Sequence, residues 1–238
     1  MNKKSNTGWI IVIVAIILFF VGIVIWRLSD KQATQVDYSN YNTNSIIAAT
    51  ADNGEIGDHV KGNPSAPVVI YEYADYQCSA CAGMNTRVNK LLEEYGDKLA
   101  IVYRNFLLSY HQNATAAASA AEAAGLQGYW KEYADKLFAN QSTWSEASGE
   151  ERTQMFADLF ANVSGGKGDV SQFITDMNSD KVKAKLNFDA GLSKNLDIPG
   201  TPSFFLDGQI ISLSNISSEE DFLNLFREKI DAKLAQQQ

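Results

Sequence analysis

The chain has 238 residues, of which 45% are hydrophobic and 20% charged, and its formal net charge is −8. This composition supports one or two folded domains with a hydrophobic core and excludes a largely disordered chain. The acidic balance and the lack of a basic stripe argue against nucleic-acid binding. The two cysteines and two histidines do not offer four zinc ligands in one place or a disulfide-stapled scaffold, so we expect neither a metal nor a cofactor.

The first segment along the chain is the apolar run Trp9–Trp26, which holds 18 residues without a charge. As a helix this run would be about 27 Å long, close to the bilayer hydrocarbon thickness of about 30 Å, with a tryptophan at each interface. A cleaved signal peptide would have a shorter apolar region and then a small-x-small cleavage site, whereas Arg27 and Leu28 follow here. We therefore predict one uncleaved transmembrane signal-anchor over 9–26, with a buried core helix as the alternative.

Positive charges set the expected orientation of this anchor. Lys3 and Lys4 precede the run together with the terminal amine, while Arg27 and a lysine follow it beside an acidic residue. This small bias places residues 1–8 in the cytoplasm and the rest of the chain outside it, at the cell membrane. The next stretch, 27–58, is polar and rich in Asn, Thr and Ser, so we predict a flexible linker.

Residues 59–238 are expected to form one α/β domain that starts with a βαβ unit. Val68–Tyr73 is a β-prone apolar run that follows two prolines, which predicts a buried strand. Ser79–Tyr95 has an apolar stripe at helical spacing and is followed by Gly96, which predicts a helix and its end. Leu99–Phe106 is the second predicted strand.

The C-terminal part of this domain has the pattern of a hairpin and a helix. Ser203–Leu206 and Gln209–Leu213 are apolar runs separated by Asp-Gly, which is a strong hairpin signal. Ser218–Leu234 is the last predicted helix, with a serine N-cap and acidic residues in its first turn. The stretch between the two halves, about 110–196, is helical in pattern and far longer than a crossover requires. We therefore predict a small mixed sheet with an inserted helical subdomain.

The two cysteines lie in the sequence Cys78-Ser79-Ala80-Cys81, at the junction of the first strand and the helix. A helix N-terminus has unpaired N–H groups and a partial positive charge, which lower the pKa of a thiol placed there. Cys81 lies one turn later, where it can close a disulfide with Cys78 and resolve a mixed disulfide. The alternatives are half of a zinc site, an inert structural disulfide and two buried thiols, but the βαβ context favours redox activity.

Two further features support redox chemistry, each with a simpler alternative. Glu72 lies in an otherwise apolar strand, six residues before Cys78. It is either an exposed strand residue or a buried carboxylate with a raised pKa that accepts the proton of Cys81. Thr201-Pro202 precedes the third strand. A trans bond would make it an ordinary loop, whereas a cis bond would set the Thr201 backbone beside the cysteines, ready to pair with an extended substrate.

The remaining histidines and tryptophans are expected to have local roles. His59 stands at the boundary between linker and domain, where we expect it to be solvated. His111 precedes the Ala-rich stretch and is expected to act as a cap or a loop residue. Trp130 and Trp144 are expected to pack in the core or between subdomains.

The order of these elements and three sequence segments resemble the DsbA-like thiol–disulfide oxidoreductases of the thioredoxin superfamily. The segments are GNPSAPVVIYEYADYQCSAC, LFANQ and IPGTPSFFLDG, and the resemblance covers about residues 59–235. It implies a thioredoxin-like fold with a nucleophile, a resolving cysteine, a buried acid and a substrate-binding cis-proline loop. In that order, the residues concerned are Cys78, Cys81, Glu72, and Thr201 with Pro202. The Ser-Ala dipeptide between the cysteines matches neither the Pro-His of strongly oxidising members nor the Gly-Pro of thioredoxins, so one source of thiolate stabilisation is missing.

Three functions are compatible with these features. The first, which we favour, is a membrane-tethered enzyme that forms disulfides in exported proteins outside the cytoplasm, where disulfides persist. Its partners would be exported proteins with cysteines and, as the resemblance implies, a quinone-linked oxidase of the membrane. The second is an exported reductase or isomerase kept reduced by a membrane electron donor. The third is a non-catalytic tethered binding module, against which the intact cysteine site argues.

Overall fold

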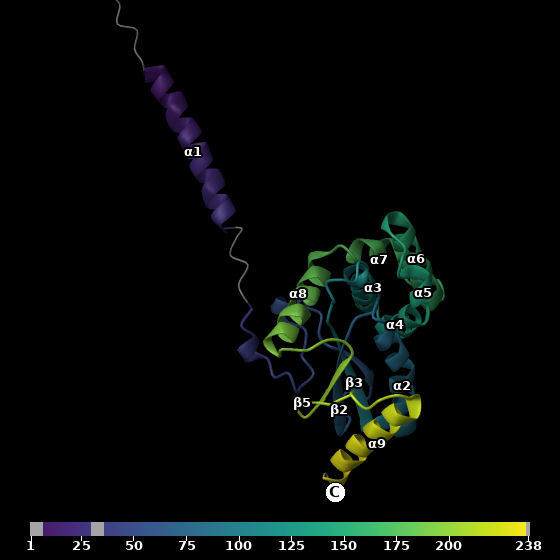
Figure 1. Cartoon of the computed structure of the whole chain (residues 1–238). Helices are drawn as coiled ribbons and strands as arrows, with labels where there is room; N and C mark the ends of the chain where they lie inside the picture. Colours follow the sequence, from purple (N-terminus) through teal and green to yellow (C-terminus); the bar gives the residue numbers. More distant parts are fainter. Residues whose placement is uncertain (1–6, 30–35, 237–238) are drawn as a thin grey trace, which may run out of the picture. The chain divides into compact units, whose positions relative to one another are not determined.

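The structure is a computed structural model that describes residues 7–29 and 36–236. The chain divides into two compact units, Met1–Asp37 and Tyr38–Gln238. The second unit holds the sheet and the helices that surround it (Figure 1). It is therefore the unit that contains both cysteines and the predicted substrate loop.

Helix α1 (Thr7–Ser29) is the regular element of the first unit. It contains the predicted anchor over 9–26. Within the described part of the chain, no helix reaches the combination of length and hydropathy that a membrane span requires. Residues 1–6 of the predicted cytoplasmic segment, and the side chains at 10, 11 and 24–26 of the predicted anchor, lie outside the described residues.

The second unit is built on a five-stranded sheet with the strand order β1-β3-β2-β4-β5. The central strands β2 and β3 are parallel, and the other neighbouring pairs are antiparallel. The strands are β1 (His59–Gly62), β2 (Val68–Ala74), β3 (Leu99–Asn105), β4 (Ser203–Leu206) and β5 (Gln209–Ile210). This arrangement confirms the mixed α/β sheet that the sequence predicts.

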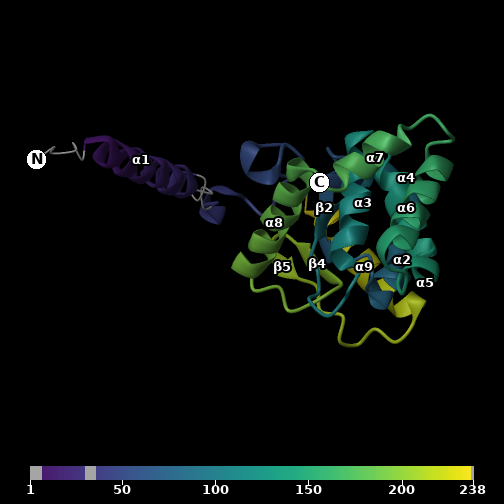
Figure 2. The ribbon, with the colours of Figure 1, turned by 90° about the horizontal axis from the view of Figure 1, so that it is seen from above.

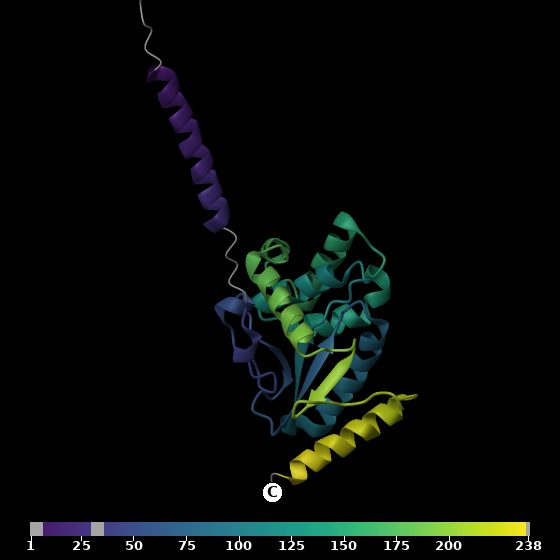
Figure 3. The ribbon, with the colours of Figure 1, turned by 60° about the vertical axis from the view of Figure 1, so that its left-hand side comes forward.

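The predicted βαβ unit forms the centre of the sheet. Between β2 and β3 lie α2 (Ser79–Tyr95), with the predicted bounds, and the 3-10 turn η3 (Gly96–Lys98). Helix α9 (Glu219–Ala235) packs beside α2, and the two helices share a core with the sheet that includes Phe204 and Phe222 (Figure 3). Because both central strands are covered by other elements, their sequences are apolar almost throughout.

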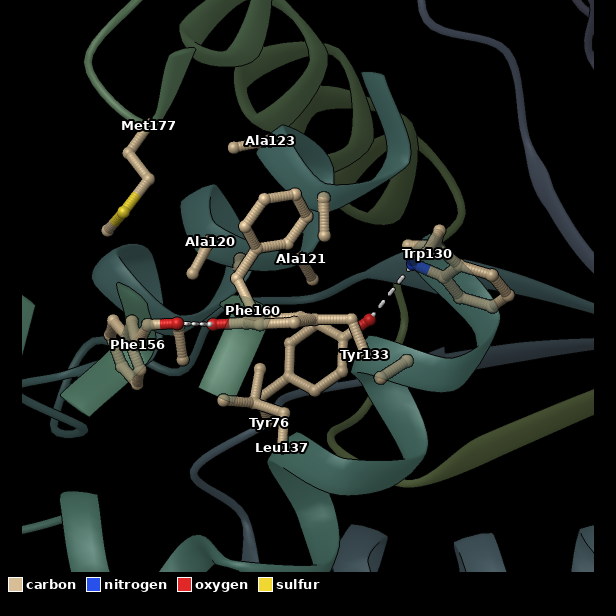
Figure 4. Packing of buried hydrophobic residues seen from close by; sticks show 14 of the residues in the cluster. Tyr76, Ala120, Ala121, Ala123, Trp130, Tyr133, Leu137, Phe156, Phe160 and Met177 are labelled. Carbon is tan, nitrogen blue, oxygen red and sulfur yellow. Dashed lines mark hydrogen bonds between the residues drawn. The ribbon is translucent and has the colours of Figure 1, made fainter. Parts of the chain in front are cut away.

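Helices α3 to α8 follow β3 and precede β4 along the chain, where the helical insertion is predicted. In Figure 2, α3 to α7 are grouped together and α8 lies to one side of them. Their bounds are α3 (Ala114–Leu126), α4 (Trp130–Ala139), α5 (Gln141–Trp144), α6 (Gly149–Val163), α7 (Val170–Asp176) and α8 (Asp180–Asn195). The Ala-rich α3 is almost entirely buried, because small side chains let α4, α7 and α8 approach it closely. Aromatic residues fill the space that remains: the rings of Phe160 and Phe173 stack 4.4 Å apart, and the Tyr133 hydroxyl donates to the Phe156 carbonyl (Figure 4).

Part of the linker predicted over 27–58 is ordered, because from residue 38 onward the chain packs on the domain. We call residues 38–58 the strap. It contains the 3-10 turns η1 (Tyr38–Asn40) and η2 (Ala51–Asn53). The ring of Tyr41 lies 4.8 Å from the ring of Phe188 in α8, centroid to centroid.

A buried arginine explains why a polar segment is ordered here. Arg104 in β3 donates to the carbonyl oxygens of Thr43 and Ser45 at 2.9 and 3.0 Å. Its guanidinium also pairs with Asp58 at 2.7 Å, and both side chains are fully buried. Lys185 of α8 lies 3.7 Å from the same carboxylate. Since a buried charge is costly unless it is paired and hydrogen-bonded, the strap supplies acceptors that the interior of the domain needs.

Strand β1 is not predicted from the sequence, and it removes His59 from solvent. The imidazole stacks on Trp130 with ring centroids 4.4 Å apart, and its Nε2 lies 2.7 Å from Oε2 of the buried Glu122. Burial raises the pKa of Glu122, but His59 and other partners hold it below its usual value. The prediction of a solvated His59 is therefore wrong, because a four-residue edge strand has too little apolar pattern to be recognised.

Candidate active site

The two cysteines lie at the N-terminus of α2, at the carboxyl end of β2. Cys78 is the N-cap residue of the helix and Cys81 lies in its first turn. Both are free thiols; Cys78 is 8% exposed, whereas Cys81 is fully buried. Cys78 is therefore the sulfur that another molecule can reach.

The loop before β4 meets the cysteines from a distant part of the chain. The Thr201–Pro202 peptide bond is cis, which is one of the two alternatives that the sequence leaves open. The Cys78 Sγ atom lies 3.7 Å from the Thr201 carbonyl oxygen, although the two residues are 123 positions apart. They meet because β4 pairs with β2 and places Ser203 opposite Tyr73. The structure thus brings together the predicted nucleophile and the predicted substrate loop.

The surroundings of the two sulfurs drive their pKa values apart. The pKa of Cys78 is lowered from 9.0 to about 5, chiefly because the Cys81 thiol donates a hydrogen bond to its sulfur. Burial opposes this change, while the backbone N–H groups of Cys81 and Ala80 add to it. Burial, together with the neighbouring Cys78 sulfur, raises the pKa of Cys81. Near neutral pH, Cys78 is therefore a thiolate and Cys81 a thiol.

Glu72 lies in β2 and is 4% exposed, so the exposed-strand alternative is wrong. Burial raises its pKa from 4.5 to about 7, which Lys61 opposes and Asp135 reinforces. Its Oε1 atom has no hydrogen-bond partner among the residues that the structure describes. The charge of Glu72 also raises the pKa of Cys81. Such a carboxylate can exchange a proton near neutral pH.

Lys61 in β1 is a charged residue of this region that the sequence analysis missed. Its ammonium donates to Asn85 at 2.7 Å and to Asn89 at 3.3 Å, both in α2, and it pairs with Asp135 in α4. Asn85, Asn89 and Asp135 also line a cleft of about 400 Å³. A lysine in an unpredicted strand gives no signal of burial, although this one is 3% exposed. Within the described part of the chain, no group of three or more His, Cys, Asp or Glu side chains is placed to hold a metal ion.

Asp75 organises the turn between β2 and α2, and it too was missed. Its fully buried carboxylate accepts from the backbone N–H groups of Gln77 and Leu108, at 2.7 and 2.9 Å. The Nδ1 atom of His111 lies 2.9 Å from the same carboxylate. His111 is therefore a loop residue, as one of the two expected roles, and its side chain is also a partner of the cysteine turn. An aspartate three residues before Cys78 was the available signal, since Asp commonly bonds the backbone two residues on.

Comparison with known proteins agrees with this architecture. A family model described as thioredoxin matches residues 55–225. The Na⁺/H⁺ antiporter NhaA 1 of Mycolicibacterium gilvum is 32% identical over 157 residues, which make up 64% of this chain and 24% of that protein. The chain thus spans about a quarter of the length of the curated relatives that it matches.

Solved structures show the same fold. Oxidised BdbD from Bacillus subtilis has a TM-score of 0.61 and 20% identity, over 82% of this chain and 100% of that one. For alpha-DsbA1 from Wolbachia pipientis the TM-score is 0.58 and the identity 23%, over 76% and 94% of the two chains. These likenesses identify a thioredoxin-like fold with DsbA-like neighbours. Since the thioredoxin model also spans more than half of the chain, from before β1 into α9, the chain belongs to the thioredoxin family.

Proposed function

We propose that this chain is a membrane-tethered thiol–disulfide oxidoreductase that forms disulfide bonds in exported proteins outside the cytoplasm. One observation carries the proposal: an accessible thiolate at Cys78 and a buried thiol at Cys81 lie together beside the Thr201–Pro202 loop. An inert structural pair would need no such difference between its two sulfurs. The DsbA-like structural neighbours support the same general kind of reaction.

The proposed reaction begins with the Cys78–Cys81 disulfide. A substrate thiolate attacks the Cys78 sulfur, so a mixed disulfide forms, the Cys78–Cys81 bond breaks, and Cys81 leaves and takes up a proton. A second substrate thiolate then attacks the substrate sulfur of the mixed disulfide, which forms the substrate disulfide and releases Cys78 as a thiolate. Two electrons pass from the substrate to the enzyme. Of the two protons that the substrate thiols lose, one ends on Cys81 and the other in water.

The lowered pKa of Cys78 favours this direction of electron flow. A stabilised thiolate is a good leaving group in the second step, and it stabilises the reduced enzyme, which makes the disulfide more oxidising. The Ser-Ala dipeptide supplies no histidine for this purpose. In this chain the stabilisation comes instead from the Cys81 thiol and from backbone N–H groups.

Glu72 is proposed to carry the proton of Cys81. Cys81 is fully buried and has no direct exchange with bulk water. Glu72 is buried in the same region and has a pKa of about 7, and its charge raises the pKa of Cys81. It can therefore give a proton to Cys81 when that sulfur leaves, and remove one when it attacks.

The tether is proposed from the charge-free run 9–26 and from the lysines that precede it. Cell fractionation with alkaline carbonate extraction tests the tether. Labelling of Cys78 in intact cells by a membrane-impermeant thiol reagent tests the orientation, and labelling only after lysis would reverse it.

The decisive experiment measures the reduction potential of the Cys78–Cys81 pair, with oxidase and reductase assays run in parallel. We expect a potential clearly less negative than the roughly −270 mV of thioredoxin, with oxidation of substrate thiols and reoxidation by a quinone-linked membrane oxidase. A potential near that of thioredoxin would favour a reductase or isomerase supplied by a membrane electron donor. If the protein exchanged no disulfides in either assay, the result would favour the third function, a non-catalytic tethered binding module.

A further inference from the structure

The segment LFANQ, which carries part of the family resemblance, has a direct contact with the cysteine turn. It spans the end of α4 and the first residue of α5, Gln141. The side-chain amide of Gln141 donates to the carbonyl oxygen of Tyr76 at 2.7 Å and to that of Cys78 at 3.0 Å. One side chain of the helical insertion thus holds the backbone on both sides of Gln77.

A second glutamine makes the reciprocal contact. The amide nitrogen of Gln77 donates to the carbonyl oxygen of Ser145 at 3.0 Å, and its amide oxygen accepts from the backbone N–H of Asn113 at 2.6 Å. The cysteine turn therefore both donates hydrogen bonds to the helical insertion and accepts hydrogen bonds from it. These four bonds connect the cysteine turn to the loop before α3 and to the region of α5.

The side chain of Tyr76 anchors the turn from the other side. It is fully buried in the core of the insertion, where Nε1 of Trp130 donates to its hydroxyl at 3.2 Å (Figure 4). Packing of this ring alone fixes where the turn lies, but not how its peptide groups are oriented. The backbone bond from the Ala82 N–H to the Cys78 carbonyl, at 3.1 Å, acts on these peptide groups, and the two bonds from Gln141 add to it.

The orientation of these peptide groups matters for the Cys78 sulfur. The Cys78 side chain makes no capping hydrogen bond of ordinary geometry, so the N–H groups of Ala80 and Cys81 act on its sulfur as dipoles, beside the Cys81 thiol. A small rotation of the Cys78 peptide would lengthen these contacts, and charge–dipole interactions weaken with distance.

We propose that Gln141 is a positioning residue for thiol–disulfide exchange, which holds the carbonyls of Tyr76 and Cys78 so that the Cys78 sulfur stays over the N-terminus of α2. The inference rests on the proposed function for its catalytic meaning. Gln141 touches neither the sulfur nor a substrate, so it acts through the backbone. The helical insertion is then part of the machinery that sets the reactivity of the cysteine pair.

The test replaces Gln141 in the full-length reduced protein and titrates the Cys78 thiolate by its ultraviolet absorbance. Gln141→Met keeps the length of the side chain and removes both donors. We expect the pKa of Cys78 to rise by about one pH unit, the size of effect that one net hydrogen bond allows. The equilibrium constant for oxidation of glutathione should fall about tenfold in parallel.

Gln127→Ala is the matched control. The side-chain amide of Gln127 also makes two hydrogen bonds to the backbone of the insertion: its nitrogen donates to the Asp169 carbonyl at 2.9 Å, and its oxygen accepts from the Asp169 N–H at 2.8 Å. Its loss should lower the thermal stability without changing the thiolate titration. If Gln141→Met lowered only the stability and left the titration at its wild-type position, the positioning role would be overturned.

A second variant guards against a folding failure. Gln141→Glu keeps the shape of the side chain but sets a carboxylate against two carbonyl oxygens, so we expect a larger rise in the pKa of Cys78. An unchanged titration in this variant would equally contradict the proposal. The titration needs no substrate, so it reports on Gln141 even if the wild-type protein exchanges no disulfides, an outcome that would count against the proposed function alone.

Discussion

Cys78 and Cys81 differ in accessibility, in charge and in role. The helix N-terminus and the Cys81 thiol hold a negative charge on Cys78, while burial keeps the proton on Cys81. In the proposed reaction, this division lets one sulfur meet the substrate and reserves the other for the internal bond. The Thr201 backbone, 3.7 Å from Cys78, lies where an extended substrate could pair with it.

Cys78→Ala should abolish thiol–disulfide exchange, because the mixed disulfide can form on no other accessible sulfur. The measurement is the rate of substrate oxidation by the purified full-length protein. Ser79→Ala, one position later in the same turn, serves as the control and should keep most of the activity. Full activity in Cys78→Ala would disprove the assignment of the nucleophile.

Glu72→Gln should slow the steps in which Cys81 gains or loses a proton, and it should make the fold more stable at alkaline pH. The native state holds the Glu72 proton up to a pKa of about 7, whereas the ordinary value is 4.5. The folded form therefore binds more protons between these values, so stability falls as pH rises through that window. At pH 8 the variant should gain about 1–3 kcal/mol in urea unfolding, and at pH 4 nothing. An equal effect at both pH values would contradict a raised pKa.

Among single residues, the sequence predicts those site residues whose role follows from their neighbours in the chain. It does not predict those whose role depends on contacts with distant parts of the chain. Both cysteines, the carboxylate of Glu72 and the Thr201-Pro202 loop stand out because each breaks a local pattern. Lys61 and His111 do not, because their roles depend on partners 74 and 36 positions away. No periodicity in the sequence connects such residues.

Among the elements, the strap and α8 show how a polar segment becomes part of a domain. The strap's carbonyls and Asp58 accept from the buried Arg104, and its tyrosines pack on Phe188. Helix α9 illustrates the opposite case, in which a local signal is sufficient. Its predicted N-cap, Ser218, accepts from the backbone N–H of Asp221, and Asp221 bonds back to complete a capping box.

Arg104→Met should destabilise the domain by about 3–5 kcal/mol, because the charge of Asp58 stays buried with a weaker partner, Lys185 at 3.7 Å. Urea unfolding measures the loss, and limited proteolysis should show faster cleavage within residues 38–58. Arg227→Met is the control. Arg227 forms ion pairs on the surface with Glu94 and Glu220, so its loss should change little. Equal effects of the two variants would show that the strap is not held by Arg104.

The strong periodic elements, such as α2 and the strands β2 and β4, are predictable because local sequence alone accounts for them. The strap and β1 are not, since their order comes from buried charges in β3, α3 and α8 rather than from an apolar pattern. For the same reason, one part of the candidate active site is predictable from the sequence and another part is not. What lies on β2 and α2 is encoded locally, whereas the contacts of Gln141 and His111 follow from how the insertion folds back on the sheet.

For the whole molecule, the two pKa values fix how the reduction potential depends on pH. Between pH 5 and the raised pKa of Cys81, reduction of the disulfide consumes two electrons but only one proton, because Cys78 remains a thiolate. The potential should therefore fall by about 30 mV per pH unit in this range and by about 59 mV per pH unit below pH 5. Equilibration with glutathione across pH measures both slopes. A slope of about 59 mV near pH 7 would show that Cys78 is protonated there.

Along the chain, the cysteine pair precedes the helical insertion and the Thr201–Pro202 loop follows it, 123 residues after Cys78. During translation Cys78 and Cys81 are therefore synthesised well before Thr201, and Gln141 is synthesised about midway between them. During synthesis the cysteines are accordingly exposed without the groups that complete their site. The full surroundings of the Cys78 sulfur therefore exist only after the chain has been made as far as Thr201.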